Sequence, residues 1–301
     1  MTQTLSRRRF LTISAACTLY ATQARATEVV RWQGRALGAG ASMQLSGLSQ
    51  HQAHPVIRAV EQELNRLENI FSLYRDGSEI VRLNTSGQLA APSADLLHVL
   101  SLSGSMNAAT LGAFDPTVQP VWRALATGDD PASARSAVGW QHVRFDAGMV
   151  RFTRADMALT LNGIAQGYIT DRIAALLRNR GLDNVLIDMG EIAAIGPRPD
   201  GRDWRAGVSQ PDGRIVHHVA LRDRAIATSA PDGTIFPTAV NAAHIIDPTA
   251  ILNVAQHKLV SVSAPSAAVA DGLSPACCLL DAGAARAAVA AFGGAEIEVM
   301  L

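Results

Sequence analysis

The stretch 160–181, TLNGIAQGYITDRIAALLRNRG, contains the residue order that most directly suggests chemistry. A turn at Asn162-Gly163 precedes apolar residues that recur with a helical period, and residues 179–181 form a stop signal. A glycine turn that feeds a helix presents backbone N–H groups at the positive end of the helix dipole, which favours an anion such as a phosphate. Such a junction can also serve packing alone, so the turn by itself leaves both interpretations open.

Three further groups of residues stand where elements should end or pack. Tyr74 follows a helical run, a position from which its ring can stack on another ring, and a structural tyrosine is the alternative. The sequence Asp115-Pro116-Thr117 has the form of a turn whose aspartate caps the following segment. Adjacent cysteines rarely form a disulfide and two alone cannot complete a metal site, so we expect Cys277 and Cys278 to be buried free thiols in a helix.

The elements that must position these residues alternate irregularly along the chain. Helices are expected at 55–74, from Ser78 after the Asp76-Gly77 turn, at 92–109, after the central turn, and at 266–280. Strands or strand ends are expected at 35–45, 143–145, 149–152, 184–196 with a glycine break, 204–208, 216–221, 225–229, 243–248 and 259–264. The polar linker 126–137 is expected to be the least ordered stretch. This mixed order predicts an α+β fold rather than alternating βαβ units.

Length and charge narrow the class of protein. A chain of 301 residues can bury a large core in one big domain or two. Lys plus Arg and Asp plus Glu are balanced at 26 each, so the electrostatic footprint of a nucleic-acid-binding protein is not visible. The mean hydropathy is only +0.14, which is typical of a globular, soluble protein.

The first residues have the form of an export signal. Residues 6–11, SRRRFL, resemble the twin-arginine signal, an apolar stretch follows at 11–21, and Ala24-Arg25-Ala26 fits an A-x-A cleavage site. The apolar stretch is too short to span a bilayer. We therefore predict a signal peptide at 1–26, one domain at 27–301 and a periplasmic location, with a cytosolic protein that has a basic start as the alternative.

Seven segments, in order and spacing, are similar to those of the ApbE family of FAD:protein FMN transferases. They are SLYRDGSEIVRLN (72–84), GAFDPTVQP (112–120), TLNGIAQGYITD (160–171), VLIDMGEIAAIG (185–196), AIATS (225–229), HIIDP (244–248) and VSVSAPSAAVADGLS (260–274). The resemblance implies a single ApbE-like α+β domain with mixed β-sheets flanked by helices. It also implies Mg²⁺-dependent transfer of FMN from FAD to a Thr or Ser of an acceptor protein, forming a phosphoester and releasing AMP.

The predicted periplasmic location and the family resemblance together suggest a partner. The acceptor is expected to be a membrane respiratory redox subunit that faces the periplasm, while the chain itself neither spans the membrane nor binds nucleic acid. The twin-arginine signal together with the short MGEI form of the glycine block resembles the branch of the family linked to nitrous-oxide respiration.

The resemblance also assigns roles at the phosphates. Asp271 matches the family's metal-ligand position, with the backbone carbonyl of Ala165 as its partner, and a capping carboxylate is the alternative for Asp271. His244 is the candidate proton acceptor for the incoming hydroxyl, because an unperturbed imidazole titrates near neutral pH. A structural histidine that donates to a carbonyl is the alternative reading of His244.

Other positions are expected to hold the dinucleotide. Tyr74 would stack on the adenine, Glu79 or Asn84 would hold its polar edges, and Thr228 and Ser229 would touch phosphate or isoalloxazine. The full set of expected FAD-binding residues is Tyr74, Glu79, Asn84, Asp115, Thr117, Gly163, Gln166, Asp188, Thr228 and Ser229.

The sequence departs from the family pattern in two segments. Thr160, Asn162 and Gln166 stand where the family usually has Asp, Gly and Lys, and Gln166 removes a positive charge near the pyrophosphate. Pro275 replaces a Thr that normally helps hold the metal, and Ser274 is its possible substitute if the backbone shifts. A periplasmic FAD-binding protein that stores or delivers flavin with weak or no transfer is therefore the alternative function, and an assembly factor without catalysis is a third.

Overall fold

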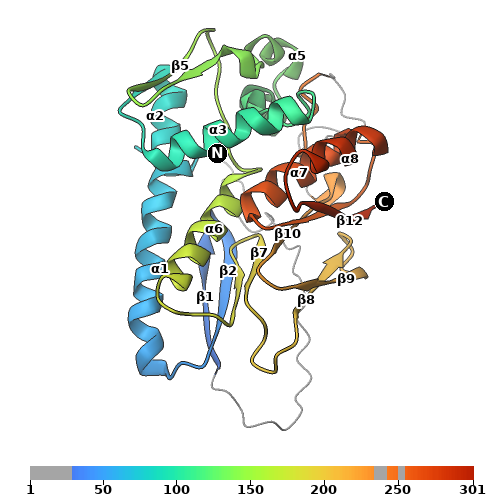
Figure 1. Ribbon diagram of the computed structural model, residues 1–301. Helices are drawn as coiled ribbons and strands as arrows, with labels where there is room; N and C mark the ends of the chain where they lie inside the picture. The colour runs from blue at the N-terminus through green and yellow to red at the C-terminus, as the bar shows by residue number, and fades with distance from the viewer. Residues whose placement is uncertain (1–28, 234–242, 250–254) are drawn as a thin grey trace.

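Seven strands form the central sheet, in the order β1-β2-β6-β7-β10-β11-β12 (Figure 1). The computed structural model describes residues 29–233, 243–249 and 255–301. The strands are β1 (Val29–Ala36), β2 (Ala39–Ser46), β6 (Val185–Asp188), β7 (Ile192–Ile195), β10 (Ala225–Ser229), β11 (Val260–Ala264) and β12 (Glu296–Met300). Every pairing within these ranges is antiparallel, because neighbouring strands follow one another through hairpins or return in the opposite direction. The expectation of mixed β-sheets is therefore wrong, whereas the α+β class is confirmed.

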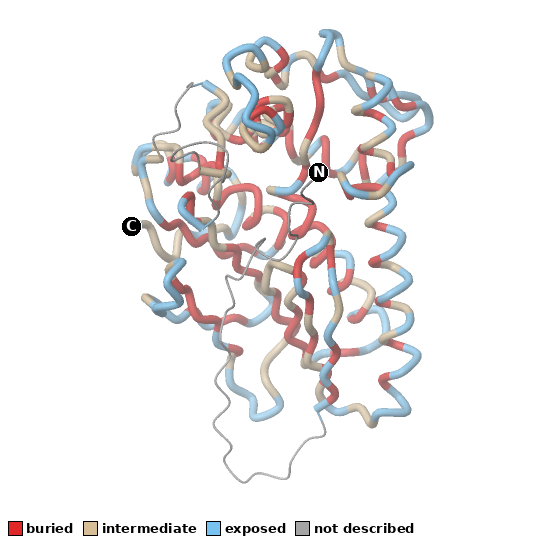
Figure 2. Tube along the Cα trace, turned by 180° about the vertical axis from the view of Figure 1, so that it is seen from behind, coloured by how far each residue is buried: buried red, intermediate tan, exposed pale blue. Residues whose placement is uncertain are grey.

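The two faces of this sheet are covered by different elements (Figure 1). Helices α6 (Ala165–Arg178) and α7 (Ala267–Leu279) pack on one face, and the hairpin of β8 (Trp204–Ser209) and β9 (Ile215–Leu221) packs on the other. Alternate side chains of a strand point to opposite faces. Figure 2 shows that buried residues follow the sheet and α6 and α7, while much of helix α1 (Gln50–Phe71) is exposed.

Helices and a small sheet gather at one end of α1 (Figure 1). The three-stranded sheet has the order β3-β5-β4. The elements of this part are α2 (Glu79–Ser86), β3 (Gln88–Ala90), α3 (Ala94–Ala109), α4 (Gln119–Thr127), α5 (Pro131–Ala134), β4 (Val143–Phe145), β5 (Met149–Phe152) and the 3-10 turns Pro116–Val118, Arg135–Ala137 and Trp140–His142. A further 3-10 turn, Pro231–Gly233, follows β10, and α8 (Ala282–Ala290) follows α7.

Several local features predicted from the sequence are present in the structure. Ser78 caps α2 by accepting from the Val81 N–H, and Gly181, with φ 74°, ends α6 as expected. The hairpin of β4 and β5 is confirmed. Cys277 and Cys278 are buried free thiols in α7, also as expected.

Other boundaries differ from the predictions. The expected strand at 35–45 is a hairpin whose turn, Leu37-Gly38, has positive φ at both residues. Helix α1 begins at Gln50, because Ser49 and Gln52 form a capping box. The expected linker at 126–137 contains α5 and a 3-10 turn, and α8 and β12 were not predicted. Of residues 243–248, only an isolated bridge at residue 243 is strand-like.

The predicted signal peptide, residues 1–26, lies outside the described residues, so its prediction stands as made. Within the described ranges, no helix combines the length and the apolar character that a membrane span requires.

Candidate functional site

Helices α6 and α7 cap each other where they cross. Asp271 of α7 accepts the Gly167 N–H of α6 at 2.8 Å through Oδ2. Asp171 of α6 accepts the Ala267 N–H at 2.7 Å, the Ala268 N–H at 3.0 Å and the Ser266 hydroxyl at 2.6 Å. The two carboxylates therefore fix the start of each helix against the other.

The close approach of the two helices depends on Gly167. A Cβ at this position would lie 2.3 Å from the carbonyl oxygen of Ala267, a backbone atom that cannot rotate away. Gly167, which also lies in the segment 160–171, therefore serves helix packing, and its close approach to α7 allows its N–H to reach Asp271.

The start of α6 is less open to an anion than the glycine turn suggests. The N–H of Ala165 donates to the Leu161 carbonyl at 2.7 Å, and that of Tyr168 donates to the Ile164 carbonyl at 3.0 Å. Gly167 already serves Asp271. Three of the first four N–H groups are thus satisfied by the protein, so the helix terminus alone cannot cradle a phosphate.

Carboxylates dominate the surroundings of this crossing. Asp271 is only 5% exposed, and its burial raises its pKa to about 7. Glu191, half-buried in the turn between β6 and β7, has its pKa raised well above the ordinary value by burial and by the negative charges of Asp271 and Asp188. Burial also raises the pKa of Asp188, whose Oδ1 accepts the Gly190 N–H at 3.1 Å. Among the described residues, none of the three carboxylates forms a salt bridge, so the site favours a cation.

The donors fit a cation that is held jointly by the protein and a phosphate. Oδ1 of Asp271 has no hydrogen-bond partner among the described residues. The Ser274 hydroxyl lies 2.8 Å from that of Ser229 and donates to the Asp271 carbonyl at 3.4 Å. In this structure the hydroxyl is therefore not placed to bind a cation together with the Asp271 carboxylate. Within the described ranges, no group of three or more His, Cys, Asp or Glu side chains is arranged to hold a metal. Mg²⁺ typically takes one or two carboxylates with waters and substrate phosphates, and Asp271 suits that mode.

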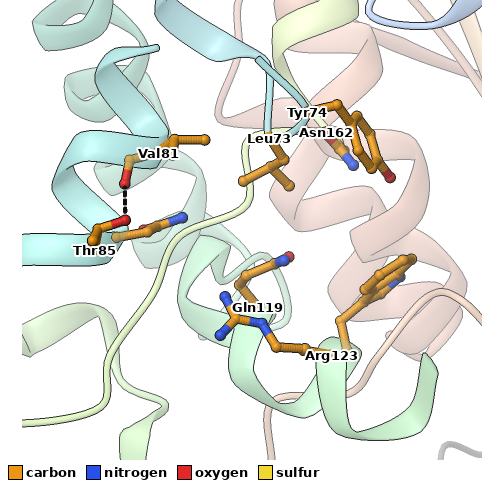
Figure 3. A pocket seen from close by; sticks show the side chains of 9 residues that line it. Leu73, Tyr74, Val81, Thr85, Gln119, Arg123 and Asn162 are labelled. Carbon is orange, nitrogen blue, oxygen red and sulfur yellow. Dashed lines mark hydrogen bonds between the residues drawn. The ribbon is translucent and has the colours of Figure 1, made fainter. Parts of the chain in front are cut away.

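A cavity of about 500 Å³ lies beside the turn at Asn162 (Figure 3). Tyr74, which is 61% exposed, lines it together with Asn162, Gln119 and Arg123. Leu73, Val81, Asn84, Thr85 and Trp122 complete the lining. Tyr74 therefore borders an open cavity, and its stack on the adenine stays a prediction.

Asn84 lines the same cavity but its amide is already engaged. Its Nδ2 donates to the Leu159 carbonyl at 2.9 Å, and its Oδ1 accepts the Leu159 N–H at 2.7 Å. Asn84 thus holds the extended segment that leads to the turn, and its predicted contact with the dinucleotide would compete with these bonds.

Three predicted FAD-binding residues satisfy the protein's own backbone. Glu79 accepts the N–H and the hydroxyl of Ser93, both at 3.0 Å, at the start of α3. Thr117 is fully buried; its hydroxyl donates to Asp115 Oδ1 at 2.6 Å and accepts the Gly139 N–H at 2.7 Å. Asp115 Oδ1 also accepts the Thr117 N–H at 2.8 Å, which confirms the predicted cap, and its Oδ2 accepts the Trp140 N–H at 3.2 Å. The polar atoms of Glu79, Asp115 and Thr117 are thus used within the protein, and none of the three residues borders the cavity beside Asn162. Their contacts with the dinucleotide stay predictions.

The two polar residues at the end of β10 point in different directions. Ser229 faces α7 through its contact with Ser274. Thr228 donates to the Ser261 hydroxyl at 3.0 Å, and it lies on the face of the strand that also carries Ile226, which packs with Trp204 of the hairpin side. The structure brings Ser229 towards Asp271 but not Thr228.

The remaining predicted residues flank the crossing. Gly163 lies beside Phe114 and Pro275, where a Cβ would be 3.8 Å from each. The Gln166 amide is buried against Gly190, next to Asp188 and Glu191. His244 is half-buried, and the next residue, Ile245, packs in the same apolar cluster as Ala270 and Leu273 of α7.

Glu191, Gln119 and Arg123 were not predicted as site residues. For Glu191 the signal was available: an acidic residue follows a glycine directly after a buried strand. For Gln119 and Arg123 the sequence shows only two polar residues on one helix face, four residues apart, which is also typical of a solvated surface.

Comparison with known proteins agrees with this arrangement. A FAD:protein FMN transferase of Vibrio cholerae serotype O1 is 31% identical over 235 residues, covering 71% of this chain and 70% of that protein. One of Treponema pallidum is 29% identical over 261 residues, covering 76% and 72%. The solved flavin transferase ApbE from Vibrio cholerae superposes with a TM-score of 0.80 at 25% identity, covering 91% of this chain and 94% of that chain. The ApbE protein of Thermotoga maritima, 23% identical, shares the fold with a TM-score of 0.77, covering 90% and 93%.

The sequence profile of the ApbE family extends over residues 37–301, which includes both helices of the crossing, the carboxylates around it and the cavity at Tyr74. The agreement in profile, sequence and fold has one reading: this chain belongs to the ApbE family.

Proposed function

We propose that the chain is an FAD:protein FMN transferase. The observation that carries the proposal is the buried carboxylate of Asp271, which accepts the Gly167 N–H near the start of α6, while the turn before that helix borders, at Asn162, a cavity of about 500 Å³. In this reaction a Thr or Ser hydroxyl oxygen of an acceptor protein bonds to the phosphorus of the FMN half. The bond from that phosphorus to the bridging oxygen breaks, AMP leaves, and the hydroxyl proton passes to a base.

A Mg²⁺ ion would be held by Asp271 and the carbonyl of Ala165, with Ser274 as a further donor if its hydroxyl turned from Ser229. When bound, it would neutralise the charge that the pyrophosphate carries and develops. The chain's own contribution is position: the bond from Gly167 to Asp271 Oδ2 fixes that carboxylate and leaves Oδ1 facing outward from the bond.

His244 is proposed as the acceptor of the hydroxyl proton. The support is that the next residue, Ile245, belongs to the same apolar cluster as Ala270 and Leu273 of α7, and that an imidazole can accept a proton as a general base. Asp247 is used locally, accepting the N–H and the hydroxyl of Thr249, both at 2.7 Å. This leaves His244 as the base of the segment HIIDP.

The location and the acceptor belong to the same proposal. The twin-arginine-like residues 6–11 support export to the periplasm, where a membrane respiratory redox subunit would present its Thr or Ser. The branch linked to nitrous-oxide respiration is the finer assignment that the signal and the MGEI segment support.

A periplasmic protein that binds and delivers FAD without efficient transfer is the second candidate. Gln166 and Pro275 favour it, because the first lacks a positive charge and the second lacks a hydroxyl that the family pattern has at these positions.

One assay separates the two. The protein is incubated with FAD, Mg²⁺ and a candidate acceptor domain, and the acceptor is examined for covalent, UV-fluorescent flavin. We expect labelling that needs Mg²⁺ and is abolished by Asp271→Ala, while some FAD binding remains. Asp183→Ala, at an exposed aspartate, is the matched control and should label normally. Unchanged labelling by Asp271→Ala would remove Asp271 from the mechanism, and tight FAD binding without labelling would favour the delivery protein.

A further inference from the structure

Gln119 is a buried residue whose amide atoms reach a cavity. It is the first residue of α4, is only 7% exposed, and forms no side-chain hydrogen bond with any described residue. Among the described residues, its amide atoms do not belong to the polar atoms that are sealed from solvent without a partner, so they are accessible to a ligand that enters the cavity. Gln119 borders the cavity beside Asn162, and its amide is directed into that cavity (Figure 3).

Arg123 lies one helical turn after Gln119 and therefore on the same face of α4. Its side chain is exposed and has no hydrogen bond or ion pair with the described part of the chain. Among the described residues that line the cavity, Arg123 is the only charged one. Figure 3 shows Tyr74 and Asn162 across the cavity from Gln119 and Arg123.

We propose that Gln119 and Arg123 bind one nucleotide half of FAD in this cavity, an inference that rests on the proposed function. The Gln119 amide, which has both donor and acceptor atoms, pairs with the polar edge of a heteroaromatic ring whose face meets Tyr74. The Arg123 guanidinium pairs with a phosphate oxygen. Arg123 thereby supplies the positive side chain that Gln166 does not supply at the start of α6.

The two halves of FAD share this chemistry, since adenine and isoalloxazine both have polar edges and each carries a phosphate. The test uses FAD, AMP and FMN as separate titrants and measures the dissociation constant of each for the full chain. The variants are Gln119→Leu, Arg123→Gln and Arg123→Lys. Arg58→Gln, at an exposed arginine of α1 that has no partner among the described residues, is the matched control.

We expect Arg123→Gln to weaken FAD about tenfold and Arg123→Lys to recover part of that loss, because one charge-assisted hydrogen bond is removed and then partly replaced. Gln119→Leu should also weaken FAD about tenfold while leaving the melting temperature unchanged, since the Gln119 amide makes no hydrogen bond with any described residue. A residue with a merely structural role would instead lower the melting temperature. Whichever of AMP or FMN shows the same losses identifies the bound half.

FAD affinities that are unchanged in both Gln119→Leu and Arg123→Gln, in proteins that melt as the wild type does, would overturn the proposal. Equal losses in Arg58→Gln would overturn it too. Failure of the proposed function can be told apart from failure of this inference. If the chain binds FAD through Gln119 and Arg123 but never labels an acceptor, the transferase function is wrong and the assignment of the cavity stands.

Discussion

Replacing Asp271 by Asn should make the metal-free protein more stable at pH 8. Burial raises the pKa of Asp271 from 3.8 to about 7. A difference of about 3 units corresponds to about 4 kcal/mol, at roughly 1.36 kcal/mol for each unit. Asn keeps the size of the side chain and an oxygen for the Gly167 N–H, but it never ionises.

The sign follows from proton binding. Because the folded state holds the Asp271 proton more tightly than the unfolded state does, this contribution to stability is complete below pH 3.8 and is lost as the pH rises through about 7. Above that pH the loss is constant. Removing the charge of Asp271 also removes one of the causes that raise the pKa of Glu191, which adds stability in the same direction.

Urea unfolding in EDTA at pH 5 and pH 8 measures the effect. The variant should exceed the wild type by roughly 1.5 kcal/mol at pH 5 and by about 4 kcal/mol at pH 8. Added Mg²⁺ should stabilise the wild type at pH 8 and leave the variant unchanged, since ligand binding to the folded state alone raises its stability. A variant that is less stable than the wild type at pH 8 in EDTA, or a difference that does not grow with pH, would refute the burial argument.

Three further outcomes follow from the packing. Gly167→Ala should lower the free energy of unfolding by about 3 kcal/mol, because its Cβ would press on the Ala267 carbonyl, and urea unfolding would show it. Tyr74→Ala should weaken FAD by about 1 kcal/mol, the worth of one aromatic stack, in a fluorescence titration. Cys277 and Cys278 should resist a thiol reagent in the native protein and react after unfolding, because both are buried and burial raises the pKa of each to about 12. Rapid native labelling of either would contradict that burial.

The helical period of α6 and the carboxylate of Asp271 could be identified from the sequence, because both are local features. The contact of Asp271 with Gly167, which was not singled out, could not be identified because it depends on how α6 and α7 cross. The sequence also leaves two interpretations open where a polar side chain near a segment of the family pattern could bond either a ligand or the backbone. Thr117 and Glu79 are of that kind, because their partners at Gly139 and Ser93 depend on tertiary contacts that spacing does not reveal.

Gln119 was not predicted as a site residue, because its residue type alone does not distinguish it. Gln119 is a buried residue that borders a cavity, and its amide has no hydrogen-bond partner among the described residues. Its burial, not its residue type, distinguishes it from a surface glutamine, and burial is a property of the folded chain.

The negative charge of the site predicts how the affinity for FAD depends on pH. FAD brings a negatively charged pyrophosphate towards Asp188, Glu191 and Asp271, which have no cationic partner among the described residues. Two like charges about 6 Å apart repel by roughly 3 kcal/mol at an effective dielectric constant of about 20. Without a divalent cation, FAD affinity should therefore rise as the pH falls from 8 to 6, because protonation of Asp271, whose pKa is about 7, removes part of the repulsion. With Mg²⁺ present, the affinity should instead hold or weaken over the same range, since protons then compete with the metal. Titrations of FAD in EDTA and in Mg²⁺ at the two pH values compare these trends. Affinity in EDTA that does not change with pH would show that the carboxylates do not face the pyrophosphate, and the proposed placement of FAD would be wrong.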